Sequence, residues 1–262
     1  MPKRKKVVRV LNCVPSEETE RDWLLEHAAR AGAIAAAGPL PAAVDLRESW
    51  WKVGDQGSTG ACVGWAVGDG LLRWHFVKAG KLAQTDTISP RFVWMASKET
   101  DDSTTRPTTF IDRAGTSIKS ALDVGRKYGS VREYMLPFSS AKLYAGQLET
   151  FYAAAALRKL SSYFNLGDDQ DRWRRWLAEQ GPVVTRLDVD KTWDDAKANA
   201  GNLDEYKAST KRGGHAVSLV GYTADSFIVR NSWGTGWGDA GFGYASTDYA
   251  GDAFTEAYGV VV

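Results

Sequence analysis

Two cysteines and three histidines carry most of the nucleophilic and acid–base chemistry that this sequence can offer. Cys62 lies in the stretch DQGSTGACVGWA, at the start of an apolar pattern with helical spacing. It would therefore lie at or near a helix N-terminus, which stabilises the thiolate, the reactive form of cysteine. Taken alone, Cys62 is as compatible with a small buried residue as with a nucleophile, and a partner base is needed to decide.

Among the histidines, His215 is the best candidate base. His75 lies on the same predicted helix as Cys62, roughly 20 Å along the axis at about 1.5 Å per residue, and is too far away to pair with it. His27 lies in an acidic and apolar helix pattern and is interpreted as an ordinary surface or interface residue. His215 enters a predicted strand after two glycines, where the backbone can approach a cleft closely.

The elements that must position these residues change character along the chain. Helical spacing, with caps or glycine stops, predicts helices over 62–80, 89–99, 116–129 and 168–181. Alternating and β-branched stretches predict strands over 182–189, 215–222, 226–233, 241–246 and 254–262. A helical first half and a strand-rich second half indicate an α+β fold, and a cleft between the halves is a natural place for a site.

Residues 1–44 differ from the rest and are interpreted as an N-terminal arm or a short extension similar to a pro-segment. Ser16 as cap and Gly32 as stop predict a helix over 16–32. Residues 33–44 are rich in alanine, glycine and proline, as in a linker, and a boundary is expected near Val44. The main domain is expected over 45–262, with a helical lobe over about 45–150 and a β-rich lobe over about 151–262.

Composition excludes several classes of protein. The net charge of +1 and a single basic run at Lys3–Lys6 argue against a nucleic-acid partner. No metal-ligand spacing or phosphate-binding loop is present, so no metal and no cofactor are expected. Two cysteines make no disulfide framework, and no stretch reaches the roughly 18 apolar residues of a membrane span or forms a signal peptide. A cytoplasmic protein without a membrane partner is expected.

Three stretches, in this order, resemble the papain-like cysteine peptidases: DQGSTGACVGWA, GGHAVSLVGY and VRNSWGTGWGDAGFGY. With weaker matches between them, the resemblance covers about residues 44–262. It implies a two-lobed fold with a helical N-terminal lobe, a β-barrel-like C-terminal lobe and the active-site cleft between them. It also implies a Cys62 nucleophile, a His215 base, an Asn231 that orients the imidazole and a Gln56 amide that binds the oxyanion.

The resemblance also implies the residues that line the substrate cleft. Trp233 would shield the His215–Asn231 bond from water, and Ile118 would lie at the main specificity pocket. The implied cleft residues are Gly60, Ala61, Gly115, Ile118, Gly214 and Trp233. Thr59 stands where the family usually has a second cysteine, and Val63 where it has a tryptophan. These departures leave the catalytic residues intact and leave the specificity undetermined.

The function implied is thiol-dependent hydrolysis of peptide bonds in a polypeptide substrate. Two alternatives remain open: a dedicated processing peptidase, isopeptidase or acyltransferase acting on one partner, and a non-catalytic peptide-binding module. For residues 1–44, a structural arm packed on the lobes is favoured. An inhibitory segment over the cleft comes second, and a docking element for a partner is a third interpretation. Cys13 is expected to be an ordinary buried or exposed cysteine, and a regulatory disulfide with Cys62 is not favoured.

Overall fold

A computed structural model describes residues 8–35, 38–100, 115–139 and 146–262, without the side chains of residues 99 and 100. The basic run at Lys3–Lys6 lies outside these residues. The helices are α1 Leu25–Arg30, α2 Cys62–Gly64, the π-helical η2 Trp65–Leu72, α3 Arg73–Lys78, α4 Pro90–Thr100, α5 Ile118–Lys127, α6 Leu148–Ala156, α7 Gln170–Glu179, α8 Thr192–Asp195 and α9 Thr247–Ala253, with 3-10 turns η1 Thr19–Arg21 and η4 Ala208–Thr210. The strands are β1 Val44–Asp45, β2 Ser162–Asn165, β3 Val183–Val189, β4 Asn202–Leu203, β5 Gly213–Tyr222, β6 Ser226–Arg230, β7 Phe242–Ser246 and β8 Phe254–Val261.

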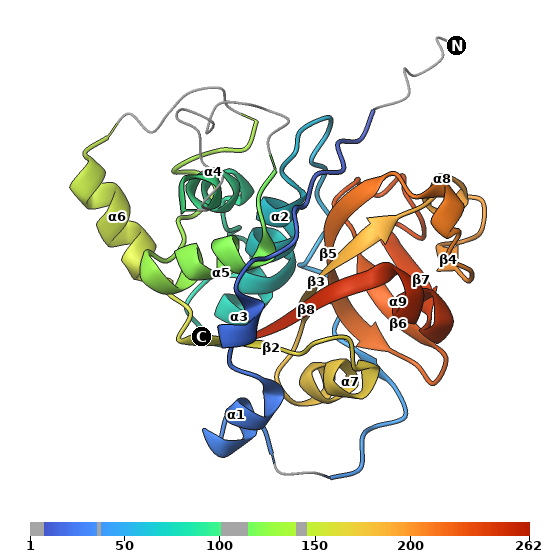
Figure 1. Cartoon of the computed structure of the whole chain (residues 1–262). Helices are drawn as coiled ribbons and strands as arrows, with labels where there is room; N and C mark the ends of the chain where they lie inside the picture. The colour runs from blue at the N-terminus through green and yellow to red at the C-terminus, as the bar shows by residue number, and fades with distance from the viewer. Residues whose placement is uncertain (1–7, 36–37, 101–114, 140–145) are drawn as a thin grey trace.

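Helices α2 to α6 gather on one side of the molecule and most of the sheet lies on the other (Figure 1). The four predicted main-domain helices are present, because their local signals are strong. Ser89 accepts a hydrogen bond from Phe92 N, and the Ser117 side chain accepts one from Ser120 N, so both act as N-caps. The first of these helices is continuous through α2, η2 and α3 and ends before Gly80, whose φ is +70°.

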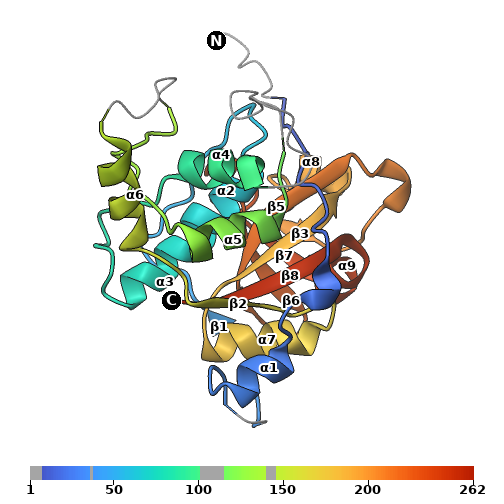
Figure 2. The same ribbon diagram turned by 60° about the vertical axis from the view of Figure 1, so that its left-hand side comes forward.

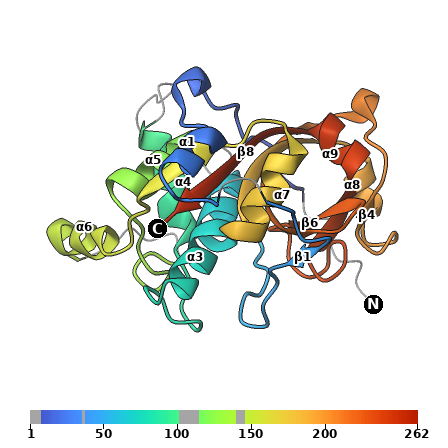
Figure 3. The same ribbon diagram turned by 90° about the horizontal axis from the view of Figure 1, so that it is seen from below.

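The strands form one sheet with the order β2-β8-β3-β5-β6-β7-β4, and β1 pairs with β5. The five predicted strands are all present, which confirms the α+β class. The expectation of a barrel-like lobe is wrong, because the sheet is not closed. Its two ends are β2 and the short β4, which pairs only with β7 among the described strands. Seen from below, α6 and the α8–α9 region lie at opposite edges of the molecule (Figure 3).

The continuous helix packs directly on β5, and small residues allow the close approach. A Cβ placed on Gly70 would lie 2.3 Å from the Ser218 hydroxyl oxygen, which itself donates to the Ala66 carbonyl. This packing fixes the distance between the start of the helix and the first residues of β5. Among the described residues, no helix is long and apolar enough to span a membrane.

The N-terminal chain runs between the helices and the sheet (Figures 1 and 2). The predicted helix over 16–32 is wrong: only η1 and the short α1 form, although Gly32 does stop the segment with a φ of +74°. The reason is that residues before α1 bond to the body of the protein instead of to each other. Ser16 N donates to Glu256, and the Ser16 hydroxyl accepts from Lys119 N at the start of α5.

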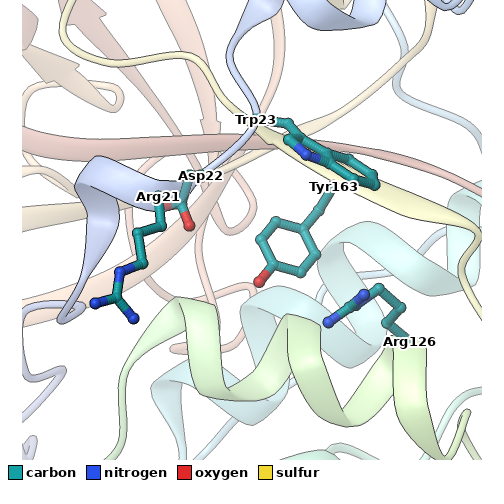
Figure 4. A pocket seen from close by; sticks show the side chains of 5 residues that line it. All are labelled: Arg21, Asp22, Trp23, Arg126 and Tyr163. Atoms are coloured by element: carbon teal, nitrogen blue, oxygen red, sulfur yellow. The ribbon is translucent and has the colours of Figure 1, made fainter.

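The buried carboxylate of Asp22 anchors this N-terminal chain to both the helical half and the sheet. Asp22 forms an ion pair with Lys119 at 2.7 Å and accepts hydrogen bonds from Tyr258 Oη and Asn165 Nδ2. Figure 4 shows Asp22 beside a small cavity of about 130 Å³. The side chains of Trp23, Arg126 and Tyr163 also line this cavity. The chain before Asp22 is therefore held at a fixed place on both halves.

Candidate active site

Cys62 is the first residue of α2, with Ala61 as the N-cap, and both side chains are fully buried. The helix that starts here continues for three segments, so its N-terminal partial positive charge faces the thiol. The middle segment is π-helical, a rare geometry that is often found at functional sites. The predicted position of Cys62 at a helix start is confirmed.

His215 lies near the start of β5, opposite Leu187 of β3, and is fully buried. Its Nε2 lies 2.8 Å from Asn231 Oδ1. Asn231 Oδ1 also accepts from Ser232 N at 2.8 Å, which fixes the amide oxygen toward the ring. Since the oxygen can only accept, His215 Nε2 carries the proton in this pair. Nδ1 has no hydrogen-bond partner among the described residues and is the nitrogen left for Cys62.

Aromatic rings surround the imidazole. Trp233 lies 5.0 Å from the His215 ring and Trp193 lies 5.5 Å from it, the latter edge to face. Trp233 and Trp193 also contact each other at 5.3 Å between ring centroids. His215 and Asn231 are both buried, so the bond between them lies in a low-dielectric setting.

Gln56 is buried, and its side chain has a fixed orientation. Its Oε1 accepts from Ser232 Oγ at 2.8 Å, and its Nε2 donates to the Thr59 carbonyl at 3.0 Å. An amide nitrogen has two N–H groups, so one remains for a further acceptor. The neighbouring backbone is tied as well, because Gln56 N donates to the Ser232 carbonyl.

The pKa of the Cys62 thiol is held well below its usual range. The main cause is a hydrogen bond from the Cys13 thiol, followed by the imidazole of His215 and the backbone at Ala216; burial opposes these effects. Cys13 shows the opposite behaviour, since burial and the neighbouring Cys62 raise the pKa of its thiol. Both cysteines are free.

Cys13 comes to this position because the N-terminal chain is bonded both to the sheet and to the segment before α5. Cys13 N donates to the Gly214 carbonyl of β5 at 3.0 Å, and Val14 N donates to the Thr116 carbonyl before α5 at 3.2 Å. Arg186 Nε donates to the Cys13 carbonyl at 3.0 Å. Cys13 thus lies between the helical side and the sheet, in contact with the candidate nucleophile.

The predicted cleft residues lie around the same chain. A Cβ on Gly115 would lie 1.8 Å from the Asn12 carbonyl oxygen, and one on Gly214 would lie 2.2 Å from that of Cys13, so both positions need glycine for this close approach. Ile118 is fully buried in the same hydrophobic cluster as Cys13 and Cys62. The remaining three, Gly60, Ala61 and Trp233, lie directly before Cys62 and beside His215.

Three residues at the site were not singled out from the sequence, and Cys13 was expected to be an ordinary cysteine. Arg9 comes from the N-terminal chain, Trp193 from α8 and Arg186 from β3, and no local motif marks them. The other two histidines lie elsewhere. His75 is buried beside Trp74, and burial lowers its pKa to about 4, while His27 Nδ1 accepts from Leu24 N in the N-terminal segment. The described residues contain no cluster of three or more His, Cys, Asp or Glu side chains able to hold a metal.

The chain matches the model of the papain family cysteine proteases over residues 40–258. It is 24% identical over 210 residues to a cathepsin L-like proteinase of Fasciola hepatica, a match that covers 78% of this chain and 59% of that protein. It is 36% identical over 70 residues to cysteine proteinase 3 of Entamoeba histolytica, covering 25% of this chain and 23% of that protein. The matches thus span less than two thirds of the length of either relative.

Among solved structures, the chain is similar to xylellain, a cysteine protease from Xylella fastidiosa. The TM-score is 0.79 at 22% identity, covering 100% of this chain and 98% of that one. It is also similar to the digestive procathepsin L2 proteinase of the Tenebrio molitor larval midgut, with a TM-score of 0.72 at 20% identity, covering 97% and 78%. At these identities the likeness concerns the fold, which is the two-sided arrangement of helices and sheet described above.

Proposed function

Because this chain belongs to the papain family of cysteine proteases, we propose that it hydrolyses peptide bonds in polypeptides with Cys62 as the nucleophile. One observation carries this proposal more than any other. His215 Nε2 is bonded to Asn231 Oδ1 at 2.8 Å, while Nδ1 has no partner among the described residues and the pKa of Cys62 is lowered in part by the same ring. A thiolate beside an oriented imidazole is the arrangement that nucleophilic catalysis requires.

In the proposed reaction, the Cys62 thiolate attacks the carbonyl carbon of the substrate, and the carbonyl electrons move onto the oxygen. His215 then gives a proton to the departing amine, which leaves an acyl group on Cys62. Water, deprotonated by His215, attacks this thioester and releases the acid product together with the Cys62 thiol. Asn231 acts as a positioning residue, since its fixed oxygen keeps Nδ1 directed toward the sulfur.

The developing oxyanion needs hydrogen-bond donors that are already in place. The Gln56 side chain has one N–H that is not used by Thr59, and its orientation is fixed by Ser232. The backbone N–H of Cys62, at the N-terminus of its helix, is the second proposed donor. Removing one such donor in other enzymes lowers kcat by about 10²–10³.

We also propose that the N-terminal chain inhibits the enzyme by occupying its cleft. Cys13 and Val14 take backbone acceptors on the two sides of Cys62, and a polypeptide substrate needs the same space. Cys62 itself is fully buried. We therefore propose an inhibitory segment in place of the purely structural arm that the sequence favoured. The two roles are compatible, because the anchor at Asp22 holds the N-terminal chain in the position where it blocks the site. The proposal also divides the chain into two units: an N-terminal segment of residues 1–44 and a peptidase domain of residues 45–262.

The test combines a thiol-directed epoxide probe with a diverse peptide library, on the wild type and on Cys62→Ala. We expect labelling and cleavage by the wild type and neither by the variant. Cleavage of a single bond would indicate a processing peptidase, and transfer of the acyl group to an added amine would indicate an acyltransferase. Labelling and cleavage that persist in Cys62→Ala would refute the proposed nucleophile, and peptide binding without cleavage by either protein would indicate a binding module. A cytoplasmic location, compatible with two free cysteines, is likewise a proposal.

A further inference from the structure

A groove of about 900 Å³ lies beside the candidate active site, next to the ring that covers His215. Three tryptophans form much of its wall: Trp193, Trp233 and Trp237. Two acids, Asp55 and Asp194, also line it. The proposed mechanism makes no use of this groove.

Arg9 of the N-terminal chain forms part of the wall of the groove, where its guanidinium contacts Asp55, Gly57 and Trp233. Nη1 pairs with Asp55 Oδ1 at 2.5 Å and donates to the Gly57 carbonyl at 2.9 Å. Nη2 donates to the Trp233 carbonyl at 3.1 Å, and the group lies over the Trp233 ring at 5.6 Å from its centroid. A planar group with donors in several directions and a flat face fits all of these contacts, whereas an ammonium does not.

The two acids of the groove differ in how their charge is balanced. Asp194 forms an ion pair with Arg212. Within the described residues, Asp55 forms an ion pair only with Arg9. Gly57 N donates to Asp55 Oδ1 at 2.8 Å, so the carboxylate stays oriented when Arg9 leaves. The Asp55 side chain is 49% exposed and that of Arg9 only 19%, which means that the acid remains accessible to a new partner while the guanidinium is the enclosed member.

The position of the groove relative to the reaction defines what would enter it. His215 protonates the departing amine in the proposed mechanism, and Trp233 connects the His215 ring to the Arg9 guanidinium. Val14, by contrast, bonds to Thr116 before α5, and neither residue lines the groove. The groove therefore accepts the part of the substrate that follows the scissile bond.

We propose that Asp55, Gly57 and Trp233 form a subsite that selects an arginine of the substrate on the leaving-group side of the scissile bond, and that Arg9 occupies it in the closed state. This inference rests on the proposed function of Cys62. It assigns to Asp55, the residue just before Gln56, a role in specificity that is separate from the chemistry.

The test uses the full chain carrying Arg9→Ala, so that Asp55, Gly57 and Trp233 are free to bind the substrate. Internally quenched peptides share one neutral sequence and carry arginine, or its uncharged near-isostere citrulline, at each of four positions after the cleaved bond. We expect the arginine peptide to exceed its citrulline match in kcat/KM by about tenfold at one position, as for a partly exposed ion pair with a cation–π contact. Asp55→Asn brings this ratio close to one. Asp194→Asn, the matched acid already neutralised by Arg212, leaves it unchanged.

The result that overturns the inference is a ratio near one at all four positions while the neutral peptide is cleaved, or a high ratio that survives Asp55→Asn. Failure of the proposed function is distinguishable, because then even the neutral peptide is not cleaved in a Cys62-dependent way. In that case the same peptide pairs, fluorescently labelled, are titrated against the Arg9→Ala,Cys62→Ala chain. Preferential binding of arginine that depends on Asp55 supports the subsite, and equal binding refutes it.

Discussion

The proposed inhibition by the N-terminal chain predicts that Arg9→Ala raises the rate of peptide hydrolysis. In the closed state Arg9 forms an ion pair with a half-exposed carboxylate, two hydrogen bonds to carbonyl groups and a contact with the Trp233 ring. Such an ion pair contributes up to about 1 kcal/mol, and a cation–π contact contributes about 0.5–1 kcal/mol. Each of the two hydrogen bonds contributes about 1 kcal/mol. Holding an arginine side chain in place costs about 1.5–2 kcal/mol. The net stabilisation of the closed state is therefore about 2 kcal/mol, or roughly 30-fold in its population.

The assay is hydrolysis of a fluorogenic peptide amide whose leaving group is a small dye, so that the substrate makes no use of the Arg9 groove. With the closed state dominant, Arg9→Ala raises the initial rate roughly 30-fold, and Arg9→Lys gives an intermediate increase because lysine keeps the charge but not the fork of donors. Arg21→Ala is the matched control. Its side chain is 74% exposed and pairs with Glu18, outside the cleft, so the rate should not change. A rate for Arg9→Ala equal to that of the wild type, or an equal rise for Arg21→Ala, would refute the occlusion.

Three further predictions concern the site and its surroundings. Gln56→Ala lowers kcat by about 10²–10³ without removing the thiolate absorbance of Cys62 at 240 nm, since only the oxyanion donor is lost; a variant with full activity would remove this role. Cys13→Ala reduces the 240 nm thiolate absorbance of the full chain at pH 7, because the Cys13 hydrogen bond is the largest cause of the lowered pKa of Cys62; unchanged absorbance would contradict it. His75 has a pKa of about 4 when folded, so the unfolded chain takes up a proton first as the pH falls below about 6.5, and stability is lost between these values. Between pH 7 and pH 5 the free energy of unfolding, measured in urea, should fall by about 2 kcal/mol because of His75. His75→Gln should remove that part of the loss. An identical pH dependence in the variant would show that His75 is not responsible.

The local elements could be predicted from the sequence because each one carries its own signals. Ser89 and Ser117 cap the helices that they precede, and Gly129 and Gly181, with φ of +93° and +128°, stop the helices before them. The order of the strands could not be predicted, because β3 pairs with β5 and β8, which are distant along the chain. Whether the sheet closes depends on these long-range pairs.

The N-terminal segment shows where local signals fail. Residues 16–32 have the composition of a helix, yet the chain near Trp23 bonds to β2 instead, with Asn165 N donating to the Trp23 carbonyl at 2.7 Å. Tertiary contacts outweigh helix propensity here, since the propensity of a short helix is weak.

The candidate catalytic residues and their neighbours also differ in how they could be found. Elimination of the other histidines favours His215 as a base, while the roles of Cys62, His215 and Asn231 are those that the resemblance of three motifs to the family implies. Neither route points to Arg9 or Cys13, because their importance depends only on where the folded body places them. A cysteine in a short apolar tail carries no signal until its thiol meets Cys62.

The central claim, that Cys62 forms the covalent intermediate, can be tested by trapping that intermediate. The Arg9→Ala chain is mixed with a peptide p-nitrophenyl ester, quenched in acid and mapped by mass spectrometry. We expect a burst of about one equivalent of p-nitrophenol and an acyl group on the peptide that contains Cys62, both absent in Arg9→Ala,Cys62→Ala. An acyl group on Cys13 or any other residue, or steady turnover that persists without Cys62, would contradict it.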